Sequence, residues 1–448
     1  MVDLGRSSRR WTAIDSAAGG LALDLGLYAA AAAFAGLTAA TSTLAPHRAW
    51  GALATTGYLL TALAVAGQLL TRRRRVDTPL AGLGARWMAT GFAWATTALL
   101  PVVAQSVQRA AGRTDRAQEE VVVVEQAGIR LVEHGTPYLG HDAISALPPA
   151  EQLLGYTPYQ PGMALFGLPR AASDAWWTDA RIWFALVTVA ILAAAVATLR
   201  AAPGPATAGS ATPSPATPAR GPAVLRGVQA ATVLPICALT LATGGDDLPV
   251  LALCLLALAL AAAGRPGRAG LAVGAAGALK LFAWPVAIVL VCWAATRRAG
   301  VRAALGALGL PILALLPALL VDRDALVENV LRFPLGHGLV TSPAQSPFPG
   351  QLIATALPAG QIIAAALLVA TGAAIAVRLL RRPPRTATAT TLVCGYGLLA
   401  AILLMPSTRF GYLLYPIALL VWAPALAEAG APRPGFRATS ATRPATRA

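Results

Sequence analysis

The sequence has little charge and few reactive side chains for its length. Only 12% of its 448 residues are Asp, Glu, Lys or Arg, and Lys280 is the only lysine. The four cysteines show neither CxxC nor Cys/His spacing, so neither disulfides nor a metal cluster are predicted. A Walker-type phosphate loop and a Gly-rich dinucleotide fingerprint are also missing, which argues against direct use of a nucleotide or NAD.

Long apolar runs, in contrast, recur along the whole chain. The mean hydropathy is +0.63, and 56% of the residues are hydrophobic. These runs predict an all-α polytopic integral membrane protein with about 12 membrane helices, some of them short or re-entrant, and interfacial helices in an outer loop. The net charge of +16 comes from short arginine clusters at the ends of apolar runs, so it indicates topology rather than nucleic-acid binding.

The arginine clusters orient the spans. Arg6, Arg9 and Arg10 predict a cytoplasmic N-terminus, and the run Arg72 to Arg75 predicts a return to that side. We expect a protein of the plasma membrane with both termini in the cytoplasm. The expected spans lie at about 20–44, 51–71, 87–106, 181–199, 227–243, 248–263 and 301–320, with two shorter halves divided at Lys280 and Pro285, and three further spans ending near 426.

This topology divides the chain into three parts. They are an accessory two-span hairpin with a basic cytoplasmic loop (1–86), a membrane domain (87–426) and a disordered cytoplasmic tail (427–448). Within the domain we expect an outer loop (107–180), a cytoplasmic Pro/Ala linker (201–222) and a second outer loop (321–350). Fourteen of the nineteen acidic residues fall in predicted outer loops, either because the chemistry lies there or because outer loops must be polar.

A charged stretch, "EEVVVVEQAGIRLVEHGTPYL", follows the third expected span, from Glu119 to Leu139. Its periodicity predicts a helix lying on the membrane surface, ended by Gly135 and Pro137. The expected apolar stripe and the residues expected to face away from it are Val124, Ala127, Leu131 and Val132 against Glu125, Gln126, Arg130 and Glu133. Charges at the start of such a helix also interact favourably with the helix dipole.

The stretch from Glu120 to Tyr138 places an acidic residue at the exit of a membrane helix, about eighteen positions before a Gly-Thr-Pro-Tyr sequence. Further pieces follow in order: "YTPYQPGMALFGLP", "DARIWF", "GGDDLPVLALCLLALAL", "AGLAVGAAGALKLFAWP" and "PSTRFGYLLYP". Over residues 115–426 the chain resembles the class C glycosyltransferase superfamily. It is most similar to bacterial polyprenyl-phosphate-mannose-dependent α-mannosyltransferases of the family 87 type. It departs from that pattern in having Glu where Asp is usual, and in its two extra N-terminal spans.

The resemblance implies a membrane glycosyltransferase acting outside the cell. It would transfer mannose or another hexose or pentose from a polyprenyl-phosphate donor to a cell-envelope glycan or glycolipid, with inversion. A carboxylate must then take the acceptor's proton, and we expect Glu120 in this role, with Glu119 second. No cofactor and no metal ligand is expected, although the adjacent Asp246 and Asp247 leave a divalent cation open.

Cations must stabilise the phosphate that leaves the sugar. Lys280 is embedded between apolar halves, which by default marks function, and Arg409 and Arg181 lie at membrane boundaries. We expect these three near the donor. The plainer alternatives are that Lys280 snorkels to the interface, that Arg409 is an ordinary loop residue and that Arg181 anchors its helix.

Six residues are expected near the sugar or the acceptor: Tyr138, Tyr156, Tyr159, Asp246, Asp247 and His337. The alternatives are that the tyrosines anchor the membrane interface, that the aspartates begin a helix and that His337 is solvated. A transporter or flippase, and a non-catalytic scaffold, are the competing functions. Against transport, the spans carry almost no ionisable residue at mid-membrane apart from Lys280. Small residues allow close packing within or between chains, which leaves the oligomeric state open.

Overall fold

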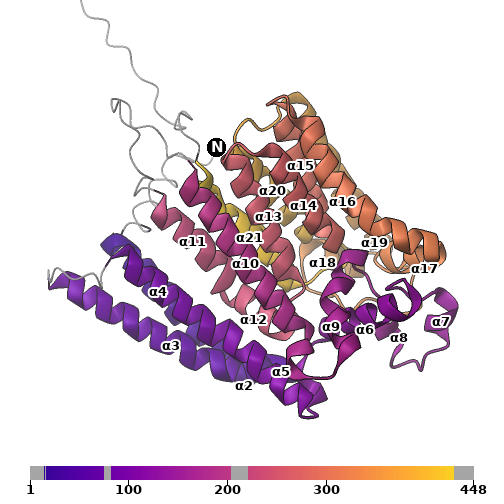
Figure 1. Ribbon diagram of the computed structural model, residues 1–448, viewed down its shortest axis with the longest axis horizontal. Helices are drawn as coiled ribbons and strands as arrows, with labels where there is room; N and C mark the ends of the chain where they lie inside the picture. Colours follow the sequence, from indigo (N-terminus) through magenta and orange to yellow (C-terminus); the bar gives the residue numbers. More distant parts are fainter. Residues whose placement is uncertain (1–14, 16, 75–81, 203–219, 428–448) are drawn as a thin grey trace, which may run out of the picture.

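The computed structural model describes residues 15, 17–74, 82–202 and 220–427. Regular structure in these ranges is helical, and β pairing is limited to an isolated bridge between Gln345 and Thr408. Figure 1 shows the long helices running side by side, with α6 (Glu119–His134), α7 (His141–Ser145) and α17 (Arg323–Val327) gathered at one end. The predicted all-α class is therefore confirmed.

Seven helical segments in the described ranges are long and apolar enough to cross a membrane: Ala17–Thr41, Ala45–Arg73, Leu83–Ala110, Ala180–Ala201, Gly300–Val321, Gly360–Arg381 and Ala387–Leu404. Counting as one span the helices α11 (Gly221–Thr232) and α12 (Pro235–Thr243), which meet at a 44° bend, makes eight. The expected count of about twelve is not confirmed. The remaining expected spans are shorter than the roughly 20 residues a helix needs to cross the hydrocarbon layer.

The N-terminal hairpin, α2 (Leu21–Thr41) and α3 (Ala45–Arg73), forms one flank of the bundle beside α4 (Leu83–Trp94) (Figure 1). It is joined to the rest by long-range hydrogen bonds. The indole Nε1 of Trp50 donates to the backbone oxygen of Thr97 at 2.7 Å, and the Tyr58 hydroxyl donates to that of Val233 at 2.7 Å. The hairpin predicted to be accessory is thus packed against the membrane domain.

A buried ionic network ties the same hairpin to α11. Asp24 on α2 is 1% exposed and accepts from the Arg86 Nε of α4 at 2.6 Å. Arg226 on α11 forms a second ion pair with Asp24, and the Gln229 amide donates to it at 3.0 Å. Removing Asp24 would leave the buried Arg86 without its counter-ion, which is strongly destabilising.

Helices α14 (Pro266–Leu279) and α16 (Gly300–Val321) pack in close contact. Gly270 and Gly274 lie four residues apart on one face of α14. A Cβ on Gly270 would lie 2.2 Å from the Ala303 backbone oxygen, and one on Gly274 would lie 2.1 Å from that of Gly306. This is the small-residue spacing that lets membrane helices approach closely.

The division predicted at Lys280 and Pro285 is present. Helix α14 ends at Leu279, Lys280 is extended (φ −153°, ψ 142°), and a short turn (Leu281–Ala283) leads into α15 (Trp284–Ala295). Helix α13 (Asp247–Ala262) begins after another turn that contains Gly244. Both interruptions place main-chain turns and polar side chains at the same cavity.

The remaining helices complete the bundle and its outer end: α5 (Leu100–Ala110), α8 (Gln152–Gly155), α9 (Leu168–Ala172), α10 (Ala180–Ala201), α18 (Pro349–Ala356), α19 (Gly360–Arg381), α20 (Ala387–Leu404) and α21 (Leu414–Trp422). Helix α10 ends at Ala201 and α11 begins at Gly221, and the expected linker (201–222) falls between and around these ends. Most of that linker (203–219), the tail (428–448) and the basic residues before position 15 lie outside the described residues.

Candidate active site

The interrupted helices surround a cavity of about 880 Å³. This is within the range of small-molecule sites, which run from about 300 to 1,000 Å³. The charged residues that line it are Glu119, Glu120, Asp246, Asp247, Lys280 and Arg409. Four carboxylates and two cations thus meet at positions between 119 and 409, and all six were among the residues expected at the site.

Glu120 and Arg409 both line this cavity, and their side chains are in contact. Glu120 lies in the first turn of α6, and its carboxylate forms an ion pair with the Arg409 guanidinium. Both side chains retain access to the cavity, with 16% and 35% of their surfaces exposed. Glu119 lines the same cavity and forms no ion pair with any described residue. The structure therefore brings both candidate bases close to one candidate phosphate ligand.

Lys280 is bound by the two aspartates of the turn before α13. Its Nζ lies 2.6 Å from Asp246 Oδ2 and 2.5 Å from Asp247 Oδ1. The Tyr415 hydroxyl also donates to Asp247 Oδ1, at 2.7 Å. Helix α13 begins at Asp247 as predicted, but neither aspartate side chain caps it. The lysine does not snorkel, because its charge is neutralised in place.

Two aromatic rings enclose the same ammonium group. Its Nζ lies 5.2 Å from the centre of the Tyr159 ring and 5.5 Å from that of Tyr412. Both distances are within the range of cation–π attraction. Since two carboxylates share Lys280, the three charges sum to −1, and Arg409 is the cavity cation that lies outside this cluster.

The segment that carries Arg409 is held by the loop between α17 and α18. The backbone N–H of Ser346 donates to the Thr408 oxygen at 2.9 Å, and the Thr408 N–H donates to the Ala344 oxygen at 3.1 Å. The Ser407 hydroxyl donates to the same Ala344 oxygen at 2.8 Å. These bonds fix the backbone directly before Arg409 and so limit where its guanidinium can reach.

Tyr156 lines the opposite wall and is held by three contacts. Its hydroxyl donates to Glu328 Oε1 at 3.0 Å and accepts from the Leu339 N–H at 2.8 Å, and its ring stacks on Phe333 at 4.2 Å. Burial alone would raise the pKa of Glu328, but hydrogen bonds from Tyr156 and His141 outweigh burial and keep that pKa below 4.5. The carboxylate therefore stays ionised and keeps Tyr156 oriented.

Three expected site residues do not line the cavity. Arg181 is fully buried, and its guanidinium donates to Asp179 and to backbone oxygens of neighbouring segments. Tyr138 is buried and its hydroxyl donates to the Tyr159 backbone oxygen at 2.8 Å, so it supports a residue of the cavity wall. His337 is exposed on the loop between α17 and α18. These residues act, if at all, through others.

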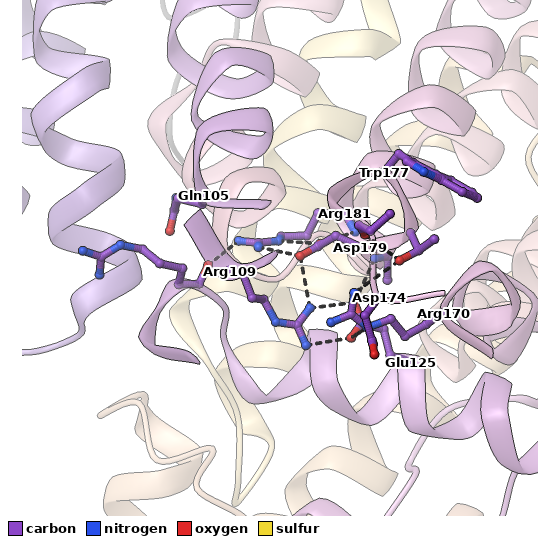
Figure 2. Close-up of polar contacts among 12 residues, drawn as sticks. Gln105, Arg109, Glu125, Arg170, Asp174, Trp177, Asp179 and Arg181 are labelled. Carbon is purple, nitrogen blue, oxygen red and sulfur yellow. Dashed lines mark hydrogen bonds and ion pairs between the residues drawn. The ribbon is translucent and has the colours of Figure 1, made fainter. Parts of the chain in front are cut away.

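A buried cluster of charged side chains joins Glu125 of α6 to Arg109, Asp179 and Arg181 (Figure 2). Arg109 donates to both oxygens of Glu125 at 2.7 Å and to Asp179 at 3.1 Å, while Arg181 pairs with Asp179 at 2.8 Å. Glu125 was expected only to face away from the apolar stripe of α6, and the structure buries it inside the protein. It is 3% exposed because Arg109 neutralises it, while Val132, expected in the apolar stripe, is 63% exposed.

Asp179 in this cluster makes stability depend on pH. Burial alone would raise its pKa, but Arg181 and Arg109 outweigh burial and lower the pKa from 3.8 to about 2. The unfolded chain therefore binds the proton more readily, so the stabilisation is complete above about pH 4 and is lost as the pH falls toward 2. We expect this carboxylate to contribute about 2 kcal/mol above that window, measured as the thermal unfolding of detergent-solubilised protein at each pH.

The comparison for this prediction is Asp179→Asn beside Asp174→Asn, since Asp174 is 94% exposed. The Asp179→Asn variant should be less stable than wild type at pH 6, and the gap should close as the pH approaches 2. The Asp174→Asn variant should follow wild type throughout. A constant gap between Asp179→Asn and wild type across the pH range would contradict the assignment.

Other cavity residues were not found from the sequence. His47 and Gln118 line the cavity, and Gln118 precedes the two candidate bases directly. Tyr412 lies in the quoted "PSTRFGYLLYP" piece, where its aromatic character was the available signal. His47 gave no signal because it lies on the hairpin to which no chemistry was assigned. Among the described residues, no group of three or more His, Cys, Asp or Glu side chains is arranged to hold a metal ion.

Membrane-length helices surround a cavity that carries carboxylates and cations in a mostly apolar lining, which is typical of a membrane-embedded protein with a polar site. A family model for glycosyltransferase family 87 matches residues 156–406, more than half of the chain. The chain belongs to glycosyltransferase family 87 and is a membrane glycosyltransferase. The matched residues do not include Glu119 and Glu120 of α6, which lie before them, or Arg409, which lies after them. No curated protein and no solved structure matched the chain.

Proposed function

We propose that the protein transfers mannose, or another hexose or pentose, from a polyprenyl-phosphate donor to a cell-envelope glycan or glycolipid. In this proposal the cavity faces the outside of the plasma membrane and both termini are cytoplasmic. The observation that carries the proposal is a single cavity lined by the Glu120 carboxylate, the Arg409 guanidinium and a wall of apolar side chains. The apolar wall, which suits an isoprenoid chain, includes Phe34, Leu234, Pro235, Ile236, Leu239, Phe410, Leu413 and Ile417.

The transfer is a single displacement. The acceptor oxygen forms a bond to the anomeric carbon, and the bond from that carbon to the phosphate oxygen breaks with its electron pair left on the phosphate. The hydroxyl proton passes to the Glu120 carboxylate. Polyprenyl phosphate leaves as an anion, so a general acid is not required, and attack from the opposite face inverts the anomeric centre.

Because Glu120 is paired with Arg409, binding of the donor phosphate to Arg409 would also act on the candidate base. A guanidinium binds a phosphate through charge-assisted hydrogen bonds, often in bidentate geometry. The Arg409 guanidinium is paired with the Glu120 carboxylate. A donor phosphate that takes over the guanidinium would free Glu120 to accept the acceptor's proton, so the base becomes available when the donor is bound.

The Lys280 cluster has a different role in the proposal. Its aspartates line the cavity and can accept hydrogen bonds from sugar hydroxyls, while Lys280 fixes both carboxylates. Two of the three ammonium protons go to Asp246 and Asp247. The third proton can bind the phosphate of the sugar donor, so Lys280 is the second candidate ligand for that phosphate after Arg409.

The test of donor and acceptor class is sugar transfer in membranes that contain the protein. Polyprenyl-phosphate mannose and other lipid-linked sugars, each labelled in the sugar, are supplied in turn. Transfer of the label to an endogenous glycan or glycolipid supports the proposal. If no lipid-linked sugar is consumed by folded protein, the donor class is wrong and the transporter and scaffold alternatives move ahead.

Replacing Arg409 with Gln should mainly weaken donor binding. The loss of one charge-assisted interaction, about 1.5–3 kcal/mol, predicts a rise of roughly ten- to a hundredfold in the KM for the lipid donor. Arg409→Lys should recover part of this loss because it keeps the charge. Arg323→Gln is the matched control, since Arg323 is exposed at the start of α17, away from the cavity lining. An unchanged donor KM in Arg409→Gln would remove Arg409 from the donor site.

A further inference from the structure

The N-terminal hairpin supplies a side chain to the cavity. His47 lies in the first turn of α3, directly after the buried Pro46. Its imidazole is half-buried in the cavity wall. Of the four histidines, all within the described ranges, it alone is in the lining, because His134, His141 and His337 lie elsewhere. The hairpin therefore reaches the same space as the candidate base on α6.

A hydrogen-bonded chain connects His47 to both sides of the site. Its Nε2 lies 3.0 Å from the Gln118 side-chain nitrogen, and the Gln118 Oε1 accepts from the Thr243 hydroxyl at 2.8 Å. In this arrangement the amide nitrogen donates to the imidazole, which is then neutral with its proton on Nδ1. The Gln118 backbone N–H also donates to the Thr243 oxygen at 2.9 Å.

The other two members of this chain, Gln118 and Thr243, lie next to the residues of the proposed chemistry. Gln118 is the N-cap residue of α6, immediately before Glu119 and Glu120. Thr243 ends α12, three residues before Asp246. A shift of Gln118 would therefore move the start of α6 relative to the Lys280 cluster. Misplacement of a reacting group by about 1 Å can cost on the order of a hundredfold in rate.

The hairpin is fixed well enough to hold His47 in place. Close to it, Trp50 is fully buried and bonded to the Thr97 backbone oxygen. At the other end of the hairpin, Asp24 is bonded to Arg86 and Arg226. The position of His47 is thus set by contacts with the membrane domain at both ends.

We propose that His47 is a positioning residue for glycosyl transfer: through Gln118 it sets the start of α6, and with it the placement of Glu120. The N-terminal hairpin then completes the active site and is more than an accessory element. This inference rests on the proposed function. It predicts an effect on the chemical step and little effect on donor binding, because His47 acts through Gln118.

The experiment is a double-mutant cycle on sugar transfer by the full chain, with His47→Phe, Gln118→Leu and the double variant. His47→Phe keeps a ring but removes the hydrogen bond. We expect each single variant to lower kcat by about tenfold or more while the donor KM stays within about twofold. The double variant should be about as slow as the slower single variant, because both remove the same link.

Two further variants separate positioning from folding. His47→Gln places an amide oxygen where it can accept from Gln118 and should restore kcat to within about threefold of wild type. His134→Phe, at the exposed end of α6, is the control and should behave as wild type. Wild-type kcat in His47→Phe, fully additive losses in the double variant, or no recovery in His47→Gln would each overturn the inference.

Failure of the inference can be told from failure of the proposed function. If Glu120→Gln abolishes transfer and His47→Phe leaves it unchanged, the glycosyl transfer stands and the role of His47 is wrong. If wild type consumes no lipid-linked sugar, the proposed function itself is wrong and the role of His47 falls with it.

Discussion

Glu120→Gln is expected to lower the rate of sugar transfer by about a hundredfold or more, with the protein still folded. General base catalysis is worth about 10²–10⁴-fold, and the amide keeps the size of the side chain while removing its ability to take a proton. Because Glu120 also pairs with Arg409, the amide releases the guanidinium. Donor binding should therefore be maintained or tighter, and the loss should be in kcat. Initial rates at several donor concentrations separate the two effects.

Glu119→Gln is the matched comparison, since it removes the same charge from the adjacent position of the same cavity. It should retain most of the activity. If only Glu119→Gln is inactive, the base is the neighbouring residue, the one without an ion pair. If both variants transfer sugar at the wild-type rate, neither carboxylate is the base and the proposed mechanism is wrong.

Lys280→Met should have the largest effect on stability. Lys280 is 7% exposed and forms ion pairs with both Asp246 and Asp247, which are 3% and 5% exposed. Removing one partner of a buried ionic group costs about 3–5 kcal/mol, because the remaining charges are left uncompensated. We expect a large drop in the thermal unfolding midpoint in detergent, or loss of folded protein from membranes.

The control for this prediction is the triple variant Lys280→Met, Asp246→Asn, Asp247→Asn. It removes the whole charge cluster and should recover much of the lost stability, since the uncompensated carboxylates are gone. It should remain inactive if the aspartates bind sugar hydroxyls. A Lys280→Met protein as stable as wild type would show that the cluster does not hold the turn before α13 to the α14–α15 break.

Much of the fold follows from local features of the sequence. Long apolar runs placed the seven membrane-length helices, and Lys280 with Pro285 marked the break between α14 and α15. Helix α6 ends at Gly135 with φ 72°, a left-handed conformation that glycine adopts without strain. The number of crossings did not follow, because short apolar helices read like spans when they lie close together along the chain.

The site was less accessible to prediction, because its contacts join distant parts of the chain. Asp246 and Asp247 were expected mainly to begin a helix, and their pairing with Lys280 depends on how α13 and α14 pack. The burial of Glu125 was not predicted, because helical periodicity does not reveal a buried arginine on another helix. His47 lies 71 residues before its partner Gln118, so no local pattern connects them.

The ionic network around Asp24 also constrains how the protein is made. Its partner Arg86 is 62 residues away along the chain, whereas Arg226 is 202 residues away. At about 5–20 residues per second, Arg226 is synthesised on the order of ten to forty seconds after Asp24. During that interval Arg86 is the cation available to Asp24. The pair between Asp24 and Arg86 can therefore form before α11 has been synthesised, and Arg226 can join it only afterwards.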